Sequence, residues 1–196
     1  MNVLLLGPQG SGKGTQAAKI AAAHGLPHVA TGDMFRAAVA AGSEVGRTVA
    51  PILAAGRLVP DELTIALIRE RLEEPDAVDG FVLDGFPRNL AQAEALDTML
   101  VEVGRPLSVV LLLELDDDSC RARLRGRAEL EGRTDDARDE VIERRLEIYH
   151  RETEPVVEHY LGTGRLVKVH AERTIPEVFA EIEQALATVE AREVAR

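Results

Sequence analysis

The glycine-rich segment near the start of the chain constrains its fold more than any other feature. Residues 3–6 form an apolar run that predicts a buried strand, and residues 7–15 follow with the sequence Gly-Pro-Gln-Gly-Ser-Gly-Lys-Gly-Thr. A helix-compatible segment begins at about Lys13. Glycines allow a tight turn whose N–H groups converge at the positive end of the helix. Lys13 adds a charge and the Thr15 hydroxyl can reach a phosphate oxygen or Mg²⁺, so the segment predicts a polyphosphate site rather than a chance turn.

Composition limits the classes of protein to which the chain can belong. The 196 residues suit a single domain, and the formal net charge of −11 argues against nucleic acid as the main partner. The single cysteine, Cys120, excludes an internal disulfide and a cysteine-rich zinc site, and we expect it to be an apolar filler on a helix. The chain opens on the first predicted strand and has no apolar run of membrane-spanning length. We therefore expect a cytoplasmic enzyme without a signal peptide or membrane partner.

Strand-like and helix-like segments alternate about five times along the chain. Gly25 and Pro27 should end the first helix, Thr31 can cap the second, Pro155 should kink the long helix that follows residue 136, and residues 174–177 fit a capping box. Strands are predicted at residues 3–6, 28–30, 81–84, 107–113 and 166–169, and helices from about residues 13, 31, 60, 90, 116, 136 and 174. The alternation predicts an α/β fold, with a parallel sheet and helices on both faces.

Two of these helices carry apolar residues at helical spacing. The helix from about Leu90 is expected to bury Leu96, Met99, Leu100 and Val103. The helix from about residue 136 is expected to bury a face made of Ile142, Leu146, Tyr149, Thr153, Val156 and Tyr160. Both patterns predict packing against the sheet.

Three polar clusters follow predicted strands and are expected to meet. Residues 7–13, 31–36 and 84–88 begin at the carboxyl ends of strands, where parallel α/β sheets bind their ligands. Asp84 ends a buried strand near the glycine-rich loop and is placed to hold Mg²⁺ through water, although it could instead be a turn former before Gly85. Together the clusters predict one binding crevice.

Two segments are predicted to move. Residues 37–56 are rich in alanine and interrupted by glycine and proline, which suits a small helical flap or, alternatively, an ordinary helical connection. Residues 126–133 are polar and begin with Gly126, which suits a lid loop. We expect Gly126 and residues 133–136 to act as the hinges of this lid.

The residues of these clusters match one family closely. The segments Gly-Pro-Gln-Gly-Ser-Gly-Lys-Gly-Thr (7–15), Thr-Gly-Asp-Met-Phe-Arg (31–36) and Leu-Asp-Gly-Phe-Pro-Arg (83–88) resemble those of adenylate kinases with a short lid, and the resemblance runs nearly end to end. It implies a P-loop NTPase fold with a five-stranded parallel sheet, and reversible phosphoryl transfer from ATP to AMP, giving two ADP, with Mg²⁺. Such enzymes maintain the balance of adenine nucleotides and are mostly monomers. The implied single kinase domain consists of a core (1–29, 60–125 and 137–196), an AMP-binding flap (30–59) and a lid (126–136).

The resemblance also implies roles for individual residues. Gln92 would pair with the edge of the AMP adenine, and Arg127 would stack on the ATP adenine. The expected ATP-binding residues are Gly10, Ser11, Gly12, Lys13, Gly14, Thr15, Arg123, Arg127 and Arg173. The expected AMP-binding residues are Thr31, Gly32, Arg36, Arg57, Leu58, Val59, Gly85, Phe86, Pro87, Arg88, Gln92, Arg133 and Arg145. The expected catalytic residues are Lys13, Asp84, Arg88, Arg123, Arg133 and Arg145. Mg²⁺ is expected to bind through phosphates and water near Thr15, Asp33 and Asp84, and no zinc site is expected.

The chain departs from the family pattern at two places. The spacing from the preceding acidic pair selects Arg144 as the arginine of the Arg-Leu-x-x-Tyr motif, whereas the leucine and tyrosine of the motif select Arg145. We prefer Arg145, because the two core-facing side chains fix the orientation of the helix. The usual Val-Asp-Gly near the last strand is Val-His-Ala at residues 169–171, and an adenine contact from this loop could survive the change if the backbone near Arg173 makes it.

The implied chemistry requires no general base. A phosphomonoester has a second pKa of about 6, so the acceptor oxygen is already charged near neutral pH, and catalysis depends on positioning and on neutralising charge. A kinase for UMP, CMP or GMP is the closest alternative, although Thr31 and Gln92 favour AMP. A non-catalytic nucleotide sensor is a further alternative, but a sensor does not need the full set of arginines.

Overall fold

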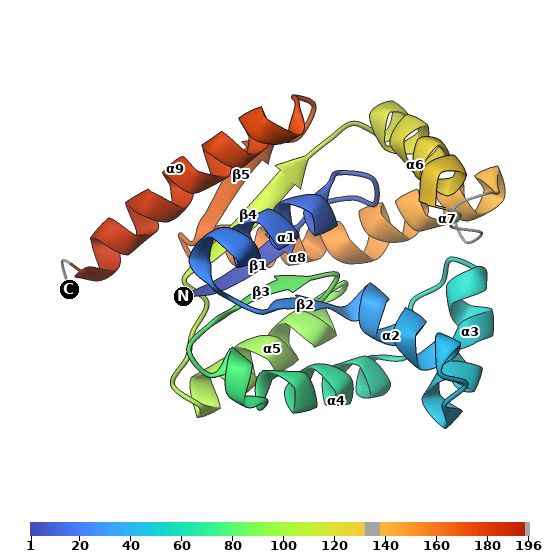
Figure 1. Ribbon diagram of the computed structural model, residues 1–196, viewed down its shortest axis with the longest axis horizontal. Coiled ribbons are helices and arrows are strands. Elements are labelled where there is room, and N and C mark those ends of the chain that lie inside the picture. Colours follow the sequence, from blue (N-terminus) through green and yellow to red (C-terminus); the bar gives the residue numbers. More distant parts are fainter. Residues whose placement is uncertain (132–137, 195–196) are drawn as a thin grey trace.

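The computed structural model describes residues 1–131 and 138–194, and in this part of the chain a five-stranded parallel sheet forms the centre of the molecule (Figure 1). The strands lie in the order β2-β3-β1-β4-β5, and each neighbouring pair is parallel. The predicted fold class is therefore confirmed. The strands are β1 (Asn2–Leu6), β2 (His28–Ala30), β3 (Phe81–Asp84), β4 (Val109–Glu114) and β5 (Leu166–His170).

The register of the sheet brings the ends of three strands together. Leu5 of β1 and Ala30 of β2 both pair with Asp84, the last residue of β3. The glycine-rich loop after β1, the helix after β2 and the segment 85–88 therefore leave the sheet at one edge. This places the three predicted polar clusters around a common space.

Helices cover both faces of the sheet. α1 and α9 pack on one face, and α4, α5 and α8 pack on the other. α2 and α3 form an insert after β2, and α6 and α7 lie across from them, beyond the carboxyl ends of the strands (Figure 1). The helices are α1 (Lys13–His24), α2 (Thr31–Ala40), α3 (Glu44–Ala54), α4 (Asp61–Leu72), α5 (Leu90–Glu102), α6 (Asp117–Glu131), α7 (Asp139–Ile148), α8 (Glu154–Leu161) and α9 (Ile175–Val194), with a 3₁₀ turn at Pro75–Ala77.

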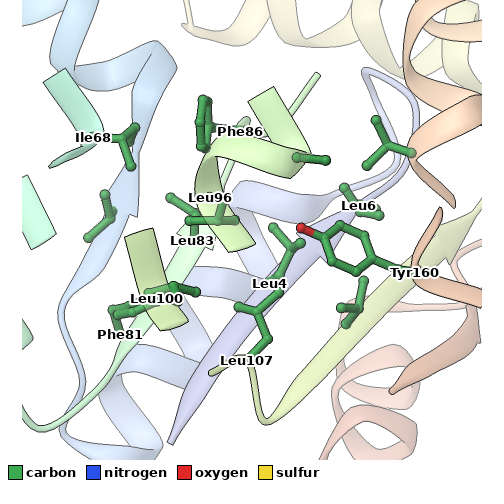
Figure 2. Packing of buried hydrophobic residues seen from close by; sticks show 14 of the residues in the cluster. Leu4, Leu6, Ile68, Phe81, Leu83, Phe86, Leu96, Leu100, Leu107 and Tyr160 are labelled. Atoms are coloured by element: carbon green, nitrogen blue, oxygen red, sulfur yellow. The ribbon is translucent and has the colours of Figure 1, made fainter. Parts of the chain in front are cut away.

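The side chains of β1 alternate between two hydrophobic cores, one on each face of the sheet. Leu4 and Leu6 face the core shared with α5 and α8, where Figure 2 shows them beside Tyr160. Val3 and Leu5 face the opposite core, which α1 and α9 cover. Successive side chains of a strand point to opposite faces, so a continuous apolar run is required for a central strand that is buried on both sides.

A π-helical turn, Tyr149–Thr153, joins α7 to α8. It lies immediately before Pro155, the residue at which the sequence predicts a kink. Proline has no N–H to donate to the carbonyl four residues earlier, and the wider turn that precedes it accommodates this missing bond. The expected buried face of this helix is confirmed, since its six residues from Ile142 to Tyr160 are all buried.

Three local predictions were wrong. Thr31 does not cap α2 but is its first residue, because Ala30 occupies the cap position and the Thr31 hydroxyl donates to the Asp84 carbonyl at 3.4 Å. Val103 is 51% exposed, since α5 ends one residue before it. Gly126 lies inside α6, which continues to Glu131, so the first part of the predicted lid segment is helical and not a loop. The rest of that segment, including the second hinge, lies outside the described residues.

None of the helices within residues 1–131 and 138–194 is both long and apolar enough to span a membrane.

Candidate active site

A cavity of about 1300 Å³ opens at the carboxyl ends of the strands. Its wall combines the glycine-rich loop, the α2–α3 insert, the segment after β3, α6, α7 and the start of α9. Among the described residues, eight cationic side chains line this wall. They come from the start of α1, the α2–α3 insert, the segment after β3, α6, α7 and the loop before α9. They are Lys13, Arg36, Arg57, Arg88, Arg123, Arg127, Arg145 and Arg173.

The glycine-rich loop adopts a conformation that requires glycine. Gly7 has φ +140° and a Cβ there would lie 2.5 Å from the Leu113 carbonyl oxygen, which is a steric clash. Gly12 caps α1 with φ 89° and has no side chain with which to accept from the first N–H groups of the helix. These N–H groups are left for a ligand in the cavity. The Ser11 hydroxyl is buried with no hydrogen-bond partner among the described residues, which also suits a bound anion.

Lys13 folds back over this loop. Its Nζ donates to the carbonyl oxygens of Gly7 at 2.7 Å and Pro8 at 2.8 Å. Burial, with smaller contributions from the charges of Arg88 and Arg127, lowers the pKa of Lys13 to about 8, although Asp84 opposes the shift. A phosphate near Nζ would restore the full charge of the ammonium group, because an opposite charge favours the protonated form.

Asp84 lies next to Lys13 at the end of β3. Burial would raise the pKa of its carboxyl group, but His28, Lys13 and Arg88 outweigh burial and hold the pKa below its ordinary value. The His28 Nε2 atom is 3.7 Å from Asp84 Oδ2. An added Cβ on Gly14 would lie 3.5 Å from the same carboxylate oxygen, so Asp84 faces the start of α1.

This corner of the cavity offers the ligands that Mg²⁺ prefers. The Thr15 hydroxyl and the Asp84 carboxylate line it beside the phosphate loop. Mg²⁺ is held in nucleotide sites by one or two such oxygens together with phosphates and water, so the residues fit the ion. Asp33, the third predicted residue, also lines the cavity and forms an ion pair with Arg36.

Arg88 is fixed at several points. Its backbone N–H donates to Gln92 Oε1 at 2.8 Å, and its Nε donates to the Gly85 carbonyl at 2.8 Å. Burial lowers the pKa of its guanidinium group, Asp84 raises it, and the neighbouring charges of Arg145 and Arg36 lower it. Arg36 and Arg145 therefore lie close enough to repel the charge of Arg88, and an anion beside Arg88 would offset this repulsion.

The predicted AMP-binding residues divide into two groups. Gly32, Arg36, Arg57, Gly85, Pro87, Arg88 and Arg145 line the cavity. Thr31, Leu58, Val59, Phe86 and Gln92 are not among the described residues that line it. Phe86 is fully buried in the core (Figure 2), so only its backbone could contact a ligand.

Gln92 already uses both ends of its amide. Its Oε1 accepts from the Arg88 N–H, and its Nε2 donates to Asp61 Oδ1 at 2.6 Å. It is 2% exposed, so the expected pairing with adenine would require these bonds to be shared or exchanged. In this structure Gln92 instead connects Arg88 to the first turn of α4.

The remaining predicted arginines differ in their surroundings. Arg123 Nη2 donates to the Ala171 carbonyl at 2.8 Å, and Arg173 forms an ion pair with Glu181. Arg144 donates to the Ala55 carbonyl at 3.3 Å, whereas Arg145 lines the cavity, in agreement with the preferred alignment. The predicted site residue Arg133 lies outside the described residues.

Several residues of the cavity wall were not among the predicted site residues, and three of them lie next to Asp84 or on the turn after α7. His28, Tyr149 and Thr153 all line the cavity. The helical spacing predicts core positions for Tyr149 and Thr153, and the hydroxyl of Thr153 on an otherwise apolar face is the one local signal of a further role. His28 precedes a predicted polar cluster by three residues, and nothing local distinguishes it from an ordinary strand residue.

Comparison with known proteins gives the family. The adenylate kinase family model matches residues 5–165. The chain belongs to the adenylate kinase family. A protein from Parvibaculum lavamentivorans, named adenylate kinase, is 48% identical over 189 residues, which cover 95% of this chain and 92% of the relative. A Synechococcus sp. adenylate kinase is 49% identical over 185 residues, covering 94% of this chain and 98% of the relative. A Streptomyces avermitilis adenylate kinase is 42% identical, covering 95% of this chain and 97% of the relative.

Membership of the adenylate kinase family confirms two expectations from the sequence. The resemblance carried by the three motifs is real, and the chain is an enzyme of this class with the P-loop fold. The cavity opens at the carboxyl ends of the strands, which is where parallel α/β sheets bind their ligands.

Proposed function

We propose that this protein transfers the terminal phosphoryl group of ATP directly to AMP and so forms two molecules of ADP. The observation that carries the proposal is the shared cavity wall, in which the phosphate loop and the Arg88 segment face one space with eight cationic side chains: Lys13, Arg36, Arg57, Arg88, Arg123, Arg127, Arg145 and Arg173. The names of the relatives support the choice of substrates.

ATP would occupy the side of the cavity formed by the glycine-rich loop and α6. The N–H groups of the loop and the Lys13 ammonium group would bind its phosphates, and Arg123 and Arg127 approach from α6. AMP would occupy the side formed by α2, α3 and the segment after β3, with its phosphate between Arg36 and Arg88. Arginine suits both sites because its planar fork binds two phosphate oxygens.

The residues of this cavity would catalyse transfer by position and charge. The phosphate of AMP is already ionised near neutral pH, so no residue is assigned as general base. Arg88 and Arg145 would contact the group in transit, where charge is spread over three oxygens. Thr15 and Asp84 would hold Mg²⁺, which supplies charge neutralisation at the phosphates when it is bound.

Water competes with AMP for the phosphoryl group. We propose that the lid segment closes only when both nucleotides are bound, so that water is excluded during transfer. We also propose that the protein acts as a cytoplasmic monomer, as the resemblance implies. Light scattering of the purified protein would measure its mass, and a mass of two chains would contradict the monomer.

One assay tests the proposed substrates. The protein is mixed with ATP, Mg²⁺ and, in parallel, AMP, CMP, UMP or GMP, and nucleoside diphosphate is measured over time. We expect fast transfer to AMP, slow transfer to the others and slow hydrolysis of ATP alone. Equal transfer to another monophosphate, or fast hydrolysis without AMP, would contradict the proposal. An inhibitor of two adenosines joined by five phosphates should also bind, since it spans both sites.

Arg88→Ala tests the role of the arginines. We expect turnover to fall by about 100-fold to 1000-fold, because a donor to the transition state is lost. Arg69→Ala is the matched control, since Arg69 is half exposed on α4 and pairs with Glu102 at 3.5 Å, away from the cavity. Near-normal turnover of Arg88→Ala, with folding retained, would remove Arg88 from the site.

A further inference from the structure

Thr153, the last residue of the π-helical turn, donates a hydrogen bond to the backbone of Arg88. We propose that Thr153 is a positioning residue, which holds the backbone of Arg88 so that the guanidinium group meets the transferring phosphate. This inference rests on the proposed function, because it concerns the same arginine. It adds a residue that neither the glycine-rich loop nor the Arg88 motif contains.

The contact is short and partly buried. Thr153 Oγ1 donates to the Arg88 carbonyl oxygen at 2.8 Å, across 65 residues of sequence. Thr153 is 7% exposed, so solvent does not readily replace this bond. A buried carbonyl that loses its donor costs free energy, and the local backbone shifts to find another partner.

Thr153 completes a set of anchors around one residue. The Arg88 N–H is held by Gln92, its carbonyl by Thr153, and its Nε by the Gly85 carbonyl, each at 2.8 Å. No described residue accepts a hydrogen bond from the two terminal nitrogens of the guanidinium group, and Arg88 lines the cavity. These hydrogen bonds therefore hold the Arg88 backbone and Nε in place, and leave the two terminal nitrogens of the guanidinium group to bind a ligand.

The π-helical turn is what allows Thr153 to reach this position. Arg145, Tyr149 and Thr153 all line the cavity, although Arg145 and Thr153 are eight residues apart. In a continuous α-helix, residues eight apart are about 80° out of line, because each residue advances about 100°. The wider turn at Tyr149–Thr153 reduces that offset and so keeps Thr153 on the wall that carries Arg145. π-Helical turns of this kind occur frequently at functional sites.

Thr153→Val tests the proposal, because valine keeps the shape of threonine and removes the donor. We expect kcat for ADP formation to fall roughly tenfold, since even a shift of about 1 Å in a reacting geometry can cost about 100-fold. The KM for ATP should stay within about twofold of the wild type. Thr153→Ser retains the hydroxyl and should recover most of the lost turnover.

Thr64→Val is the matched control. Thr64 is 5% exposed and its Oγ1 donates to the Pro60 carbonyl at 3.1 Å, but it lies on α4 and is not among the described residues that line the cavity. It should lose a similar amount of stability and keep wild-type turnover. If Thr153→Val and Thr64→Val have the same turnover, the proposal is wrong. An inactive wild type would instead refute the proposed function itself.

The Arg88→Ala background separates positioning from direct contact. If Thr153 acts through the guanidinium group, Thr153→Val should change turnover by less than about twofold once Arg88 is alanine, because the two effects are then coupled. A full tenfold loss in that background would mean that Thr153 acts on the nucleotide or on the fold, and would overturn the proposal. Should Thr153→Val not fold, Thr153→Ala takes its place. Failure of both to fold while Thr64→Val folds would count against a positioning role.

Discussion

The buried ammonium group of Lys13 gives a prediction about stability and pH. Burial beside the glycine-rich loop lowers its pKa from 10.5 to about 8 in the folded protein. Above pH 8 the folded protein therefore loses a proton that the unfolded chain keeps until about pH 10.5. The unfolded state binds more protons in this interval, so the free energy of unfolding should rise with pH there.

Lys13→Met removes the titrating group and keeps the length of the side chain. Each pKa unit corresponds to about 1.4 kcal/mol, so between pH 7 and pH 10 the wild type should gain about 2.5 kcal/mol of stability relative to Lys13→Met. This value is an upper limit, because one side of Lys13 faces the open cavity and solvent screens the charge. The sign of the pH dependence does not depend on this limit. At pH 7 the buried lysine is charged and lowers the free energy of unfolding, whereas at pH 10 it is mostly neutral in the folded protein and lowers it less.

Urea unfolding of both proteins at several pH values measures the difference. Lys168→Met is the control, since Lys168 lies exposed on β5 and pairs with Glu114 at 2.8 Å. This variant also removes one lysine charge, but at a residue that is not among the described residues lining the cavity. A wild type that gains nothing over Lys13→Met between pH 7 and pH 10 would refute the reasoning, because Lys13 would then be as well solvated as a surface lysine.

Two further predictions concern the insert and the π-helical turn. Gly46→Ala would place a Cβ 2.0 Å from the Ala38 carbonyl oxygen, so α2 and α3 must separate. We expect the free energy of unfolding to fall by about 1–3 kcal/mol. The KM for AMP should rise several-fold, and an unchanged KM for ATP is the check. His150 is bound by Glu154 at 2.7 Å and Asp117 at 3.0 Å, and the bond to Glu154 raises its pKa. Its stabilising charge is present below pH 6.5 and is lost as the pH rises through the raised value, so His150→Gln should lower the melting temperature more at pH 5.5 than at pH 8.5. Equal losses at both pH values would contradict the assignment.

Local signals in the sequence determined the elements and the place where they meet. Gly25 and Pro27 end α1 where they were expected to, because left-handed glycine and ring-closed proline act within one or two residues. The apolar run of β1 predicted a strand buried on both faces, and the alternation of elements predicted the parallel sheet. The three polar clusters could be assigned to one crevice because parallel strands end at the same edge.

Tertiary packing decided which side chains share the wall of that crevice. The sequence left Arg144 and Arg145 open, and only the direction of α7 places Arg145 in the cavity. The lowered pKa of Lys13 depends on burial in the folded protein and on charges far along the chain, such as those of Asp84 and Arg88. The bond from Thr153 to Arg88 joins residues 65 apart, and no local pattern specifies it. Backbone preferences act over a few residues, whereas contacts of this kind exist only once the helices have packed on the sheet.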